Sequence, residues 1–163
     1  MKIEVIHVEK KFDRIIMVKS VGKEKVLNVI SAYVPHVGCE VREKEEFWRE
    51  MDEVIQGIPG HEDVVIGGDM NGHVGSEKLE YERVHGGYGF GERNEAGEKV
   101  LDYAASYGLA IMNTYFKKRE EHYITYKSGG NRSQVDNFMW KRVSVKRVKD
   151  CDVIPGGSVI NIT

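Results

Sequence analysis

The chain has 163 residues and a mass of 18.6 kDa; 40% of its residues are hydrophobic, 31% are charged, and the formal net charge is −2. This composition is ordinary for a globular domain, no apolar run approaches the ~20 residues of a membrane span, and the first residues lack the apolar segment and cleavage site of a secretory signal. We therefore expect one domain over residues 1–163 of an intracellular protein. The two cysteines, Cys39 and Cys151, show no metal-binding spacing, which argues against a disulfide scaffold or a structural zinc site.

Hydrophobic patterning predicts strands and helices along the chain. Residues 26–33 form the clearest strand, which ends where Val34-Pro35 restricts the backbone and removes a donor. Residues 43–58 have the pattern of an amphipathic helix, and Asn94 is a suitable N-cap for a second helix at 95–107. The remaining strands are predicted at residues 3–8, 14–21, 64–69, 109–113, 122–126, 134–141 and 143–149, with the glycine-rich residues 72–94 as a long loop. This order indicates an α/β fold with helices packed on a mixed sheet.

Two polar residues, Asp69 and Asn71, stand at the end of the apolar strand 64–69. In layered α/β folds, ligands gather beyond the carboxyl ends of strands. A carboxylate at such a position can bind a hard cation or orient a water, and an amide two residues later can bind phosphate. The alternative is a plain turn, because Asp, Asn and Gly are common turn residues.

A second polar cluster opens the strand at 134–141. Asp136 could orient a histidine or hold a cation, and it could equally be a cap that pairs with Arg132. Tyr33 ends the strand at 26–33, where its phenol could face the same edge or simply pack.

Positive charge is concentrated between Lys117 and Lys149, where ten Lys and Arg residues stand against three Asp and Glu. A basic segment on an otherwise acidic chain could meet a polyanion. It could also be a solvated face without a partner.

Three motifs, in their order and spacing, resemble those of the endonuclease/exonuclease/phosphatase superfamily: Ala32-Tyr33-Val34-Pro35, Gly68-Asp69-Met70-Asn71 and Ser133-Gln134-Val135-Asp136. More narrowly, five stretches resemble the endonuclease domain of non-LTR retrotransposons, a domain that craniofacial development protein 2-like proteins share: LNVISAYVPHVGCE, IGGDMNGHVG, HGGYGFGERNEAG, NTYFKKREEHYITYKSGG and CDVIPGG. The resemblance covers residues 12–157.

The resemblance implies a four-layer α/β sandwich that nicks DNA with Mg²⁺ or Mn²⁺. Asp69 is expected to orient or deprotonate the attacking water and, with Asn71, to hold the metal. Tyr33 and Asn71 are expected to contact the scissile phosphate, and Ser133 to donate to a phosphate. Asp136 is the residue that orients the catalytic histidine in the family.

The sequence departs from the family in three places. Complete members begin with a strand carrying an Asn and a strand carrying a metal-binding Glu, which Glu4 and Glu9 do not match. None of the six histidines occupies the catalytic position, and Asn137 replaces an aromatic residue. We therefore expect a domain truncated at both ends and catalytically impaired. The alternatives are a non-catalytic remnant that binds nucleic acid or protein, and an unrelated phosphomonoesterase or sugar phosphatase of the superfamily.

The expected partner is DNA, bound weakly and with little sequence preference. Lys127, Arg132 and Ser133 flank or belong to the third motif, and phosphate contacts carry no base information. We expect a monomer without membrane contact, acting in the nucleus. We also expect Tyr33, Asp69, Asn71 and Asp136 to meet at one edge of the sheet.

Overall fold

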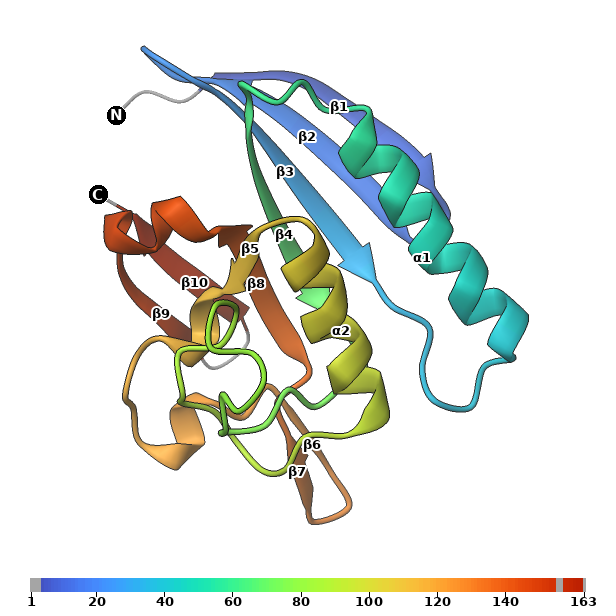
Figure 1. Cartoon of the computed structure of the whole chain (residues 1–163), viewed down its shortest axis with the longest axis vertical. Helices are drawn as coiled ribbons and strands as arrows, with labels where there is room; N and C mark the ends of the chain where they lie inside the picture. Colours follow the sequence, from blue (N-terminus) through green and yellow to red (C-terminus); the bar gives the residue numbers. More distant parts are fainter. Residues whose placement is uncertain (1–3, 155–156, 163) are drawn as a thin grey trace. The chain divides into compact units, whose positions relative to one another are not determined.

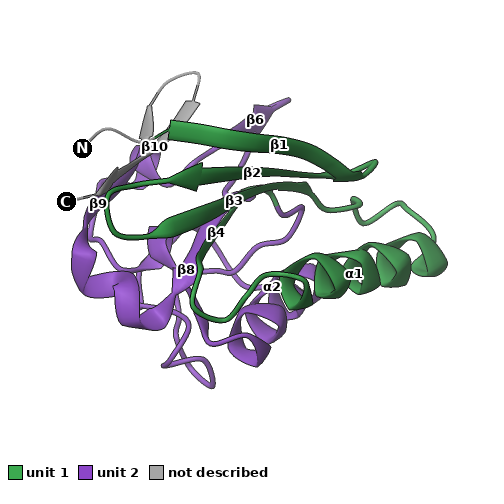
Figure 2. Cartoon of the chain, turned by 90° about the horizontal axis from the view of Figure 1, so that it is seen from above, with its two compact units in different colours: residues 1–69 green, residues 70–163 purple. Residues whose placement is uncertain are grey.

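A computed structural model of the chain describes residues 4–154 and 157–162, and the side chains of residues 4–152. The chain divides into two compact units, one ending at Asp69 and the other beginning at Met70 (Figure 2). Each unit combines strands with one α-helix.

The first unit is a four-stranded mixed sheet with one crossover helix (Figure 1). Its elements are β1 (Glu4–Phe12), β2 (Ile15–Val21), β3 (Val26–Tyr33), α1 (Val41–Gln56) and β4 (Asp63–Asp69). Strand β2 pairs antiparallel to β1 and to β3, and β4 pairs parallel to β3. A parallel pair needs a crossover connection, which α1 supplies.

The buried side chains of the first unit follow the expected periodicities. In β3, Asn28, Ile30 and Ala32 are buried while the residues between them are exposed, the alternation of a strand with one covered face. In α1, Phe47, Met51 and Val54 are buried at steps of three or four, so the helix buries a single stripe.

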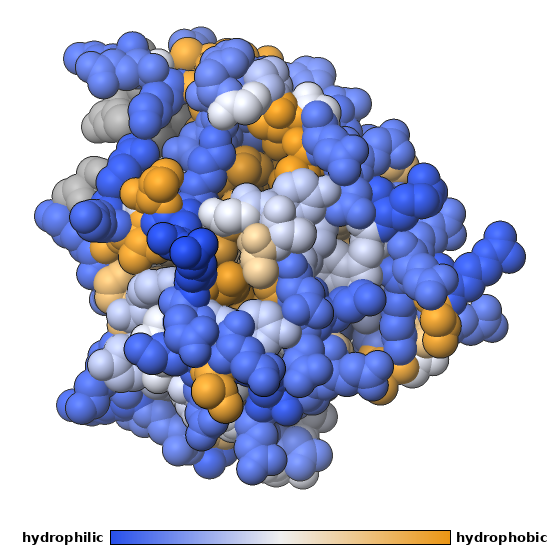
Figure 3. Space-filling model, viewed as in Figure 1, coloured by the Kyte–Doolittle hydropathy of each residue, from blue (hydrophilic) through white to orange (hydrophobic). Residues whose placement is uncertain are grey.

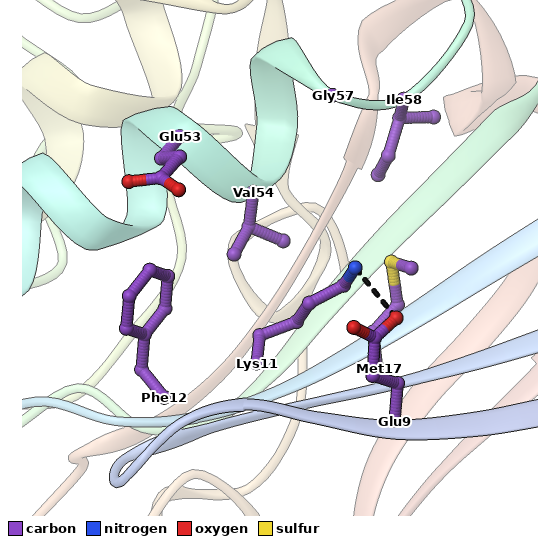
Figure 4. A pocket seen from close by; sticks show the side chains of 8 residues that line it. All are labelled: Glu9, Lys11, Phe12, Met17, Glu53, Val54, Gly57 and Ile58. Atoms are coloured by element: carbon purple, nitrogen blue, oxygen red, sulfur yellow. Dashed lines mark ion pairs between the residues drawn. The ribbon is translucent and has the colours of Figure 1, made fainter.

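A pocket of about 310 Å³ opens between the last turn of α1 and strands β1 and β2 (Figure 4). Phe12, Met17 and Val54 form its apolar walls. Across its mouth, the Lys11 ammonium and the Glu9 carboxylate form an ion pair of 2.6 Å, and that ion pair lowers the pKa of Glu9. Neither Tyr33 nor Asp69 is among the residues that line this pocket.

In the described part of the chain, the second unit holds one α-helix, three 3₁₀ helices (labelled η), two hairpins and a further pair of strands. Its elements are α2 (Glu95–Ser106), β5 (Leu109–Ile111), η1 (Met112–Thr114), η2 (Glu120–His122), β6 (Tyr126–Ser128), β7 (Asn131–Ser133), β8 (Asp136–Lys141), η3 (Arg142–Arg147), β9 (Val148–Ile154) and β10 (Gly157–Ile162). The pairs β5–β8, β6–β7 and β9–β10 are all antiparallel. Leu101, Ile111, Met139 and Trp140 are among its most deeply buried side chains.

The α/β class and most predicted elements are confirmed, and two predicted strands are wrong. Residues 122–126 contain the end of η2 and only the first residue of β6, because Tyr123 closes a compact loop: its hydroxyl accepts from Lys118 N (2.7 Å) and donates to Phe116 O (2.8 Å). Residues 143–147 lie in η3, where Val143 is 84% exposed, and β9 begins at Val148. The alternation of valines there arises in a helical turn and not in a strand.

None of the helices in the described ranges is long and apolar enough to cross a membrane. The face seen in Figure 3 is mostly hydrophilic, with hydrophobic side chains in small patches.

Candidate functional site

Tyr33 and Asp69 are neighbours at the carboxyl ends of β3 and β4. They are paired in the parallel register of these strands, and Val34 N donates to Asp69 O at 2.9 Å. The close approach requires glycine at position 68, which has φ +140° and where a Cβ would lie 2.0 Å from Ala32 O. The Gly-Gly-Asp sequence therefore lets β4 run tightly along β3 and end with Asp69 paired to Tyr33 in the strand register.

Tyr33 also lies beside Arg14, in the turn between β1 and β2. The Arg14 guanidinium carbon is 5.1 Å from the centroid of the Tyr33 ring, and Tyr33 N donates to Arg14 O at 3.0 Å. Half of Tyr33 is exposed, so the ring is supported on one side and open to a ligand on another. Nothing in the sequence pattern indicated Arg14.

Asn71 and Asp136 are brought close by the backbone of the second unit. Met70 N donates to Val135 O at 2.8 Å, so the residues that follow each of them, Asn71 and Asp136, lie near this bond. Asn71 has φ +46°, a left-handed conformation that Asn adopts more readily than most residues. The choice of Asn at this position therefore suits the turn as well as the predicted chemistry.

The backbone after Asn71 is fixed to the start of α2. His73 N donates to the Asn94 side-chain oxygen at 3.0 Å, and Asn94 N donates to His73 O at 3.1 Å. A Cβ at Gly97 would lie 1.8 Å from His73 O, so only glycine allows this contact. Asn94 also caps α2 by accepting from Gly97 N at 2.8 Å, which confirms the predicted N-cap.

Thr125 holds the third motif in place. Its hydroxyl oxygen accepts from Val135 N at 3.0 Å and from Asp136 N at 3.1 Å, and its own N–H donates to Ser133 O at 3.0 Å. Thr125 is not among the site residues predicted from the sequence. Its partners lie up to eleven residues away and meet it only because β6 and β7 form a hairpin.

The long loop 72–94 is tied to the same motif. Phe90 N donates to the Gln134 side-chain oxygen at 3.1 Å. The guanidinium of Arg93 bridges the loop, donating to Leu79 O at 3.2 Å and to Glu77 O at 2.6 Å. The predicted loop is therefore irregular in backbone but internally bonded.

The predicted DNA-contacting residues lie on the β6–β7 hairpin. Lys127 and Arg132 are opposite each other in its register and both are exposed. The Arg132 guanidinium forms an ion pair with Glu120 at 3.0 Å and lies 5.6 Å from the Phe90 ring centroid. Arg132 therefore pairs with Glu120 in place of Asp136, the partner considered from the sequence. Ser133 is half-buried at the end of β7.

Part of the basic segment serves contacts within the chain. Lys118 lies 3.5 Å from Asp150 and Asp152, and the Arg147 guanidinium lies over Trp140 at 5.5 Å from the ring centroid. Cys151 is buried among these groups, and burial raises the pKa of its thiol to about 12. This thiol is therefore protonated and unsuited to metal binding.

Within the part of the chain that the structure describes, no three His, Cys, Asp or Glu side chains gather closely enough to hold a metal ion. The two predicted ligands, Asp69 and Asn71, are a carboxylate and an amide. Such hard oxygen donors suit Mg²⁺ or Mn²⁺, which commonly take one or two carboxylates and complete their shell with water and phosphate.

No family model matches the sequence. The chain is 30% identical to craniofacial development protein 2 of Bos taurus and 29% identical to that of Tragulus javanicus, in each case over 148 residues. These matches cover 90% of the chain and 25% of each relative. The chain thus spans about a quarter of the length of the curated relatives it matches.

Several solved structures have a similar fold. The endonuclease domain of TRAS1, a telomere-specific non-LTR retrotransposon, matches with a TM-score of 0.60 and 16% identity, over 91% of this chain and 63% of that one. An endonuclease/exonuclease/phosphatase family protein from Leptotrichia buccalis matches with a TM-score of 0.53 and 13% identity, over 86% and 46%. The chain has the endonuclease/exonuclease/phosphatase fold. TDP2 of D. rerio, solved in complex with a single-strand DNA product, shares this fold at a TM-score of 0.54 and 12% identity, over 85% and 53%.

The endonuclease/exonuclease/phosphatase fold confirms the resemblance inferred from the three motifs. Within the first unit Tyr33 and Asp69 are partners in the strand register, and within the second unit Asn71 and Asp136 each follow a residue of the Met70–Val135 hydrogen bond. The meeting of all four side chains at one site stays a prediction.

Proposed function

We propose that the chain is a single endonuclease/exonuclease/phosphatase domain, related to non-LTR retrotransposon endonucleases, that binds DNA and has part of a metal-dependent phosphodiesterase site, with impaired catalysis. The observation that carries the proposal is the placement of the motif residues at strand ends, Tyr33 beside Asp69 and Asn71 near Asp136. The names of the structural neighbours, an endonuclease domain and a protein bound to a DNA product, support the substrate class. We expect a monomer that acts in the nucleus.

The four residues would divide the work on a phosphodiester. Asp69 would orient or deprotonate the attacking water, and Asn71 would support it and contact the scissile phosphate. The Tyr33 hydroxyl would donate to a phosphate oxygen, with Ser133 as a further donor. Asp136 would orient a histidine. A divalent cation at Asp69 and Asn71 would neutralise charge that develops on the phosphate.

DNA binding is the part of the proposal that can be tested directly with the 163-residue chain. Each Lys or Arg that neutralises a phosphate releases counterions, so affinity should fall as salt rises, with a log–log slope of about −0.9 per contact. Fluorescence anisotropy with a labelled duplex at two salt concentrations measures this. Arg132→Ala should weaken binding uniformly across sequences and reduce the slope by about one unit.

A matched control removes the same charge elsewhere in the second unit. Lys99 lies on the exposed face of α2. Its replacement, Lys99→Ala, should leave the DNA affinity and the salt slope nearly unchanged. A folded wild-type chain that binds no DNA at low salt, or binding that ignores salt, would contradict the proposal.

The 163 residues contain no match to the family's metal-binding Glu or catalytic His, so we expect these residues alone to nick supercoiled plasmid negligibly with Mg²⁺. Acid–base groups contribute roughly 10²–10⁴-fold each. Robust nicking that disappears in Asp69→Ala would show that other side chains supply the missing functions. DNA binding without nicking, even after addition of Mn²⁺, would favour the non-catalytic alternative for this polypeptide.

A further inference from the structure

Arg14 connects three elements of the first unit at the end where Tyr33 and Asp69 lie. Its side chain starts in the turn between β1 and β2 and crosses the Tyr33 ring at the end of β3, 5.1 Å from the centroid. It ends on α1, where Nη2 donates to the Glu43 carboxylate at 2.8 Å. The backbone reinforces this arrangement, because Arg14 O accepts from Tyr33 N at 3.0 Å.

These contacts hold the guanidinium in place without burying it. The Arg14 side chain is 27% exposed, and its ion-pair partner Glu43 is 47% exposed. A partly exposed ion pair contributes about 0–1 kcal/mol and a cation–π contact about 0.5–1 kcal/mol. The two contacts therefore stabilise the fold only slightly, and their main effect is to orient the cationic guanidinium beside an exposed phenol.

A fork and a phenol at one strand end suit a phosphate. The guanidinium has five N–H donors in one plane and can engage two phosphate oxygens at once. The Tyr33 hydroxyl supplies a neutral donor beside it. In the absence of an anion, the guanidinium is paired with the Glu43 carboxylate. An arriving phosphate would therefore share the guanidinium with that carboxylate or displace it.

We propose that Arg14 and Tyr33 form a phosphate-binding pair for the DNA backbone, with Glu43 as the counter-ion that keeps the guanidinium in position. This inference rests on the proposed function, because it takes DNA as the source of the phosphate. It adds a binding residue, Arg14, that none of the three motifs contains.

The test compares Arg14→Gln with Arg49→Gln. Arg49 is a matched control in the same unit: it lies on the exposed face of α1 and its guanidinium is 3.8 Å from Glu46 and 3.9 Å from Glu53. Both variants lose one positive charge, so a difference in DNA affinity between them cannot come from net charge alone. By anisotropy with a labelled duplex, Arg14→Gln should weaken binding about tenfold, the effect of one charged hydrogen bond, and reduce the salt slope by about one unit. Arg49→Gln should change neither measurably.

A second pair of variants keeps Arg14 intact. Glu43→Gln removes the competing carboxylate and should raise affinity more than Glu46→Gln, which removes the same charge from the same helix. Circular dichroism and a urea midpoint establish that each variant folds. If Arg14→Gln fails to fold, the Glu43→Gln comparison decides, and equal affinities of the two Glu variants overturn the inference.

The failures of the two proposals are distinguishable. If the wild-type chain binds DNA with the expected salt dependence while Arg14→Gln behaves like Arg49→Gln, the role of Arg14 is wrong and DNA binding stands. If the folded wild-type chain binds no DNA at low salt, both are overturned.

Discussion

His85 is buried between two glycines of the long loop, with 1% of its surface exposed. Its Nε2 donates to Gly75 O at 2.9 Å, and its Nδ1 accepts from Gly87 N at 3.0 Å. This arrangement requires the neutral ring with the proton on Nε2. Burial lowers the pKa of His85, an effect only partly opposed by the hydrogen bond to Gly75.

The lowered pKa predicts a pH-dependent stability. Below the ordinary histidine pKa of about 6.5, the unfolded chain takes up a proton that the folded chain refuses, so the free energy of unfolding falls as the pH decreases through that range. Urea denaturation at pH 7.5 and 5.5 measures the loss. In His85→Asn the pH dependence should shrink, at a cost in stability of about 1–3 kcal/mol for the lost buried hydrogen bonds.

The exposed His61 provides the control. His61→Gln should retain the wild-type loss of stability at pH 5.5. An unchanged pH dependence in His85→Asn would mean that other groups cause it.

At the level of elements, the two helices begin in different ways. Asn94 caps α2 and also accepts from His73 N. Glu40 stands at the N-cap of α1, where its side chain makes no capping hydrogen bond within the described part of the chain. The start of α2 therefore depends on one side chain, and the start of α1 does not.

Asn94→Ala should destabilise the protein by about 0.5–2 kcal/mol, toward the upper end because His73 N also loses its acceptor. Glu40→Ala should change stability by only a few tenths of a kcal/mol, apart from a small loss of charge near the helix start. The urea denaturation midpoints of the two variants, compared at equal m-values, measure these two losses of stability. Equal losses in the two variants would contradict this account of the caps.

Elements with strong local signals could be predicted from sequence. The strand at 26–33 coincides with β3, and the helix predicted at 95–107 coincides with α2 to within one residue at its end. The β6–β7 hairpin was missed although Gly129-Gly130, both at positive φ, is a strong turn signal. Its strands have three residues each, too few for a period to be recognised.

The residues of the candidate site likewise divide into those that the sequence predicts and those that only the structure reveals. Tyr33, Asp69, Asn71 and Asp136 could be named because motifs in fixed order carry them. Arg14 and Thr125 could not, because each acts through contacts with residues distant in sequence: Arg14 with Tyr33 and Glu43, and Thr125 with the backbone at 135–136. Such contacts depend on the register of paired strands, which periodicity alone does not determine.

At the scale of the whole molecule, the chain offers one tryptophan in each unit. Trp48 lies in α1 and Trp140 in β8. Our proposal of a single domain predicts one cooperative transition. In Trp48→Phe, fluorescence of Trp140 and far-UV circular dichroism should give the same urea midpoint, and in Trp140→Phe, fluorescence of Trp48 should likewise match the dichroism. Comparing two probes within each variant removes the effect of the substitution itself. Separate midpoints would indicate two independently folding domains.

The central claim, carried over from the proposed function, is that Asp69 and Asn71, two residues apart in the sequence, hold a divalent cation. Paramagnetic broadening by Mn²⁺ in a ¹H–¹⁵N correlation spectrum of the chain tests it most directly. We expect low Mn²⁺ concentrations to broaden the backbone amide signals of residues 69–71 first, and Asp69→Ala to abolish this broadening. Broadening confined to the acidic helix α1, or broadening at residues 69–71 that persists in Asp69→Ala, would contradict the claim.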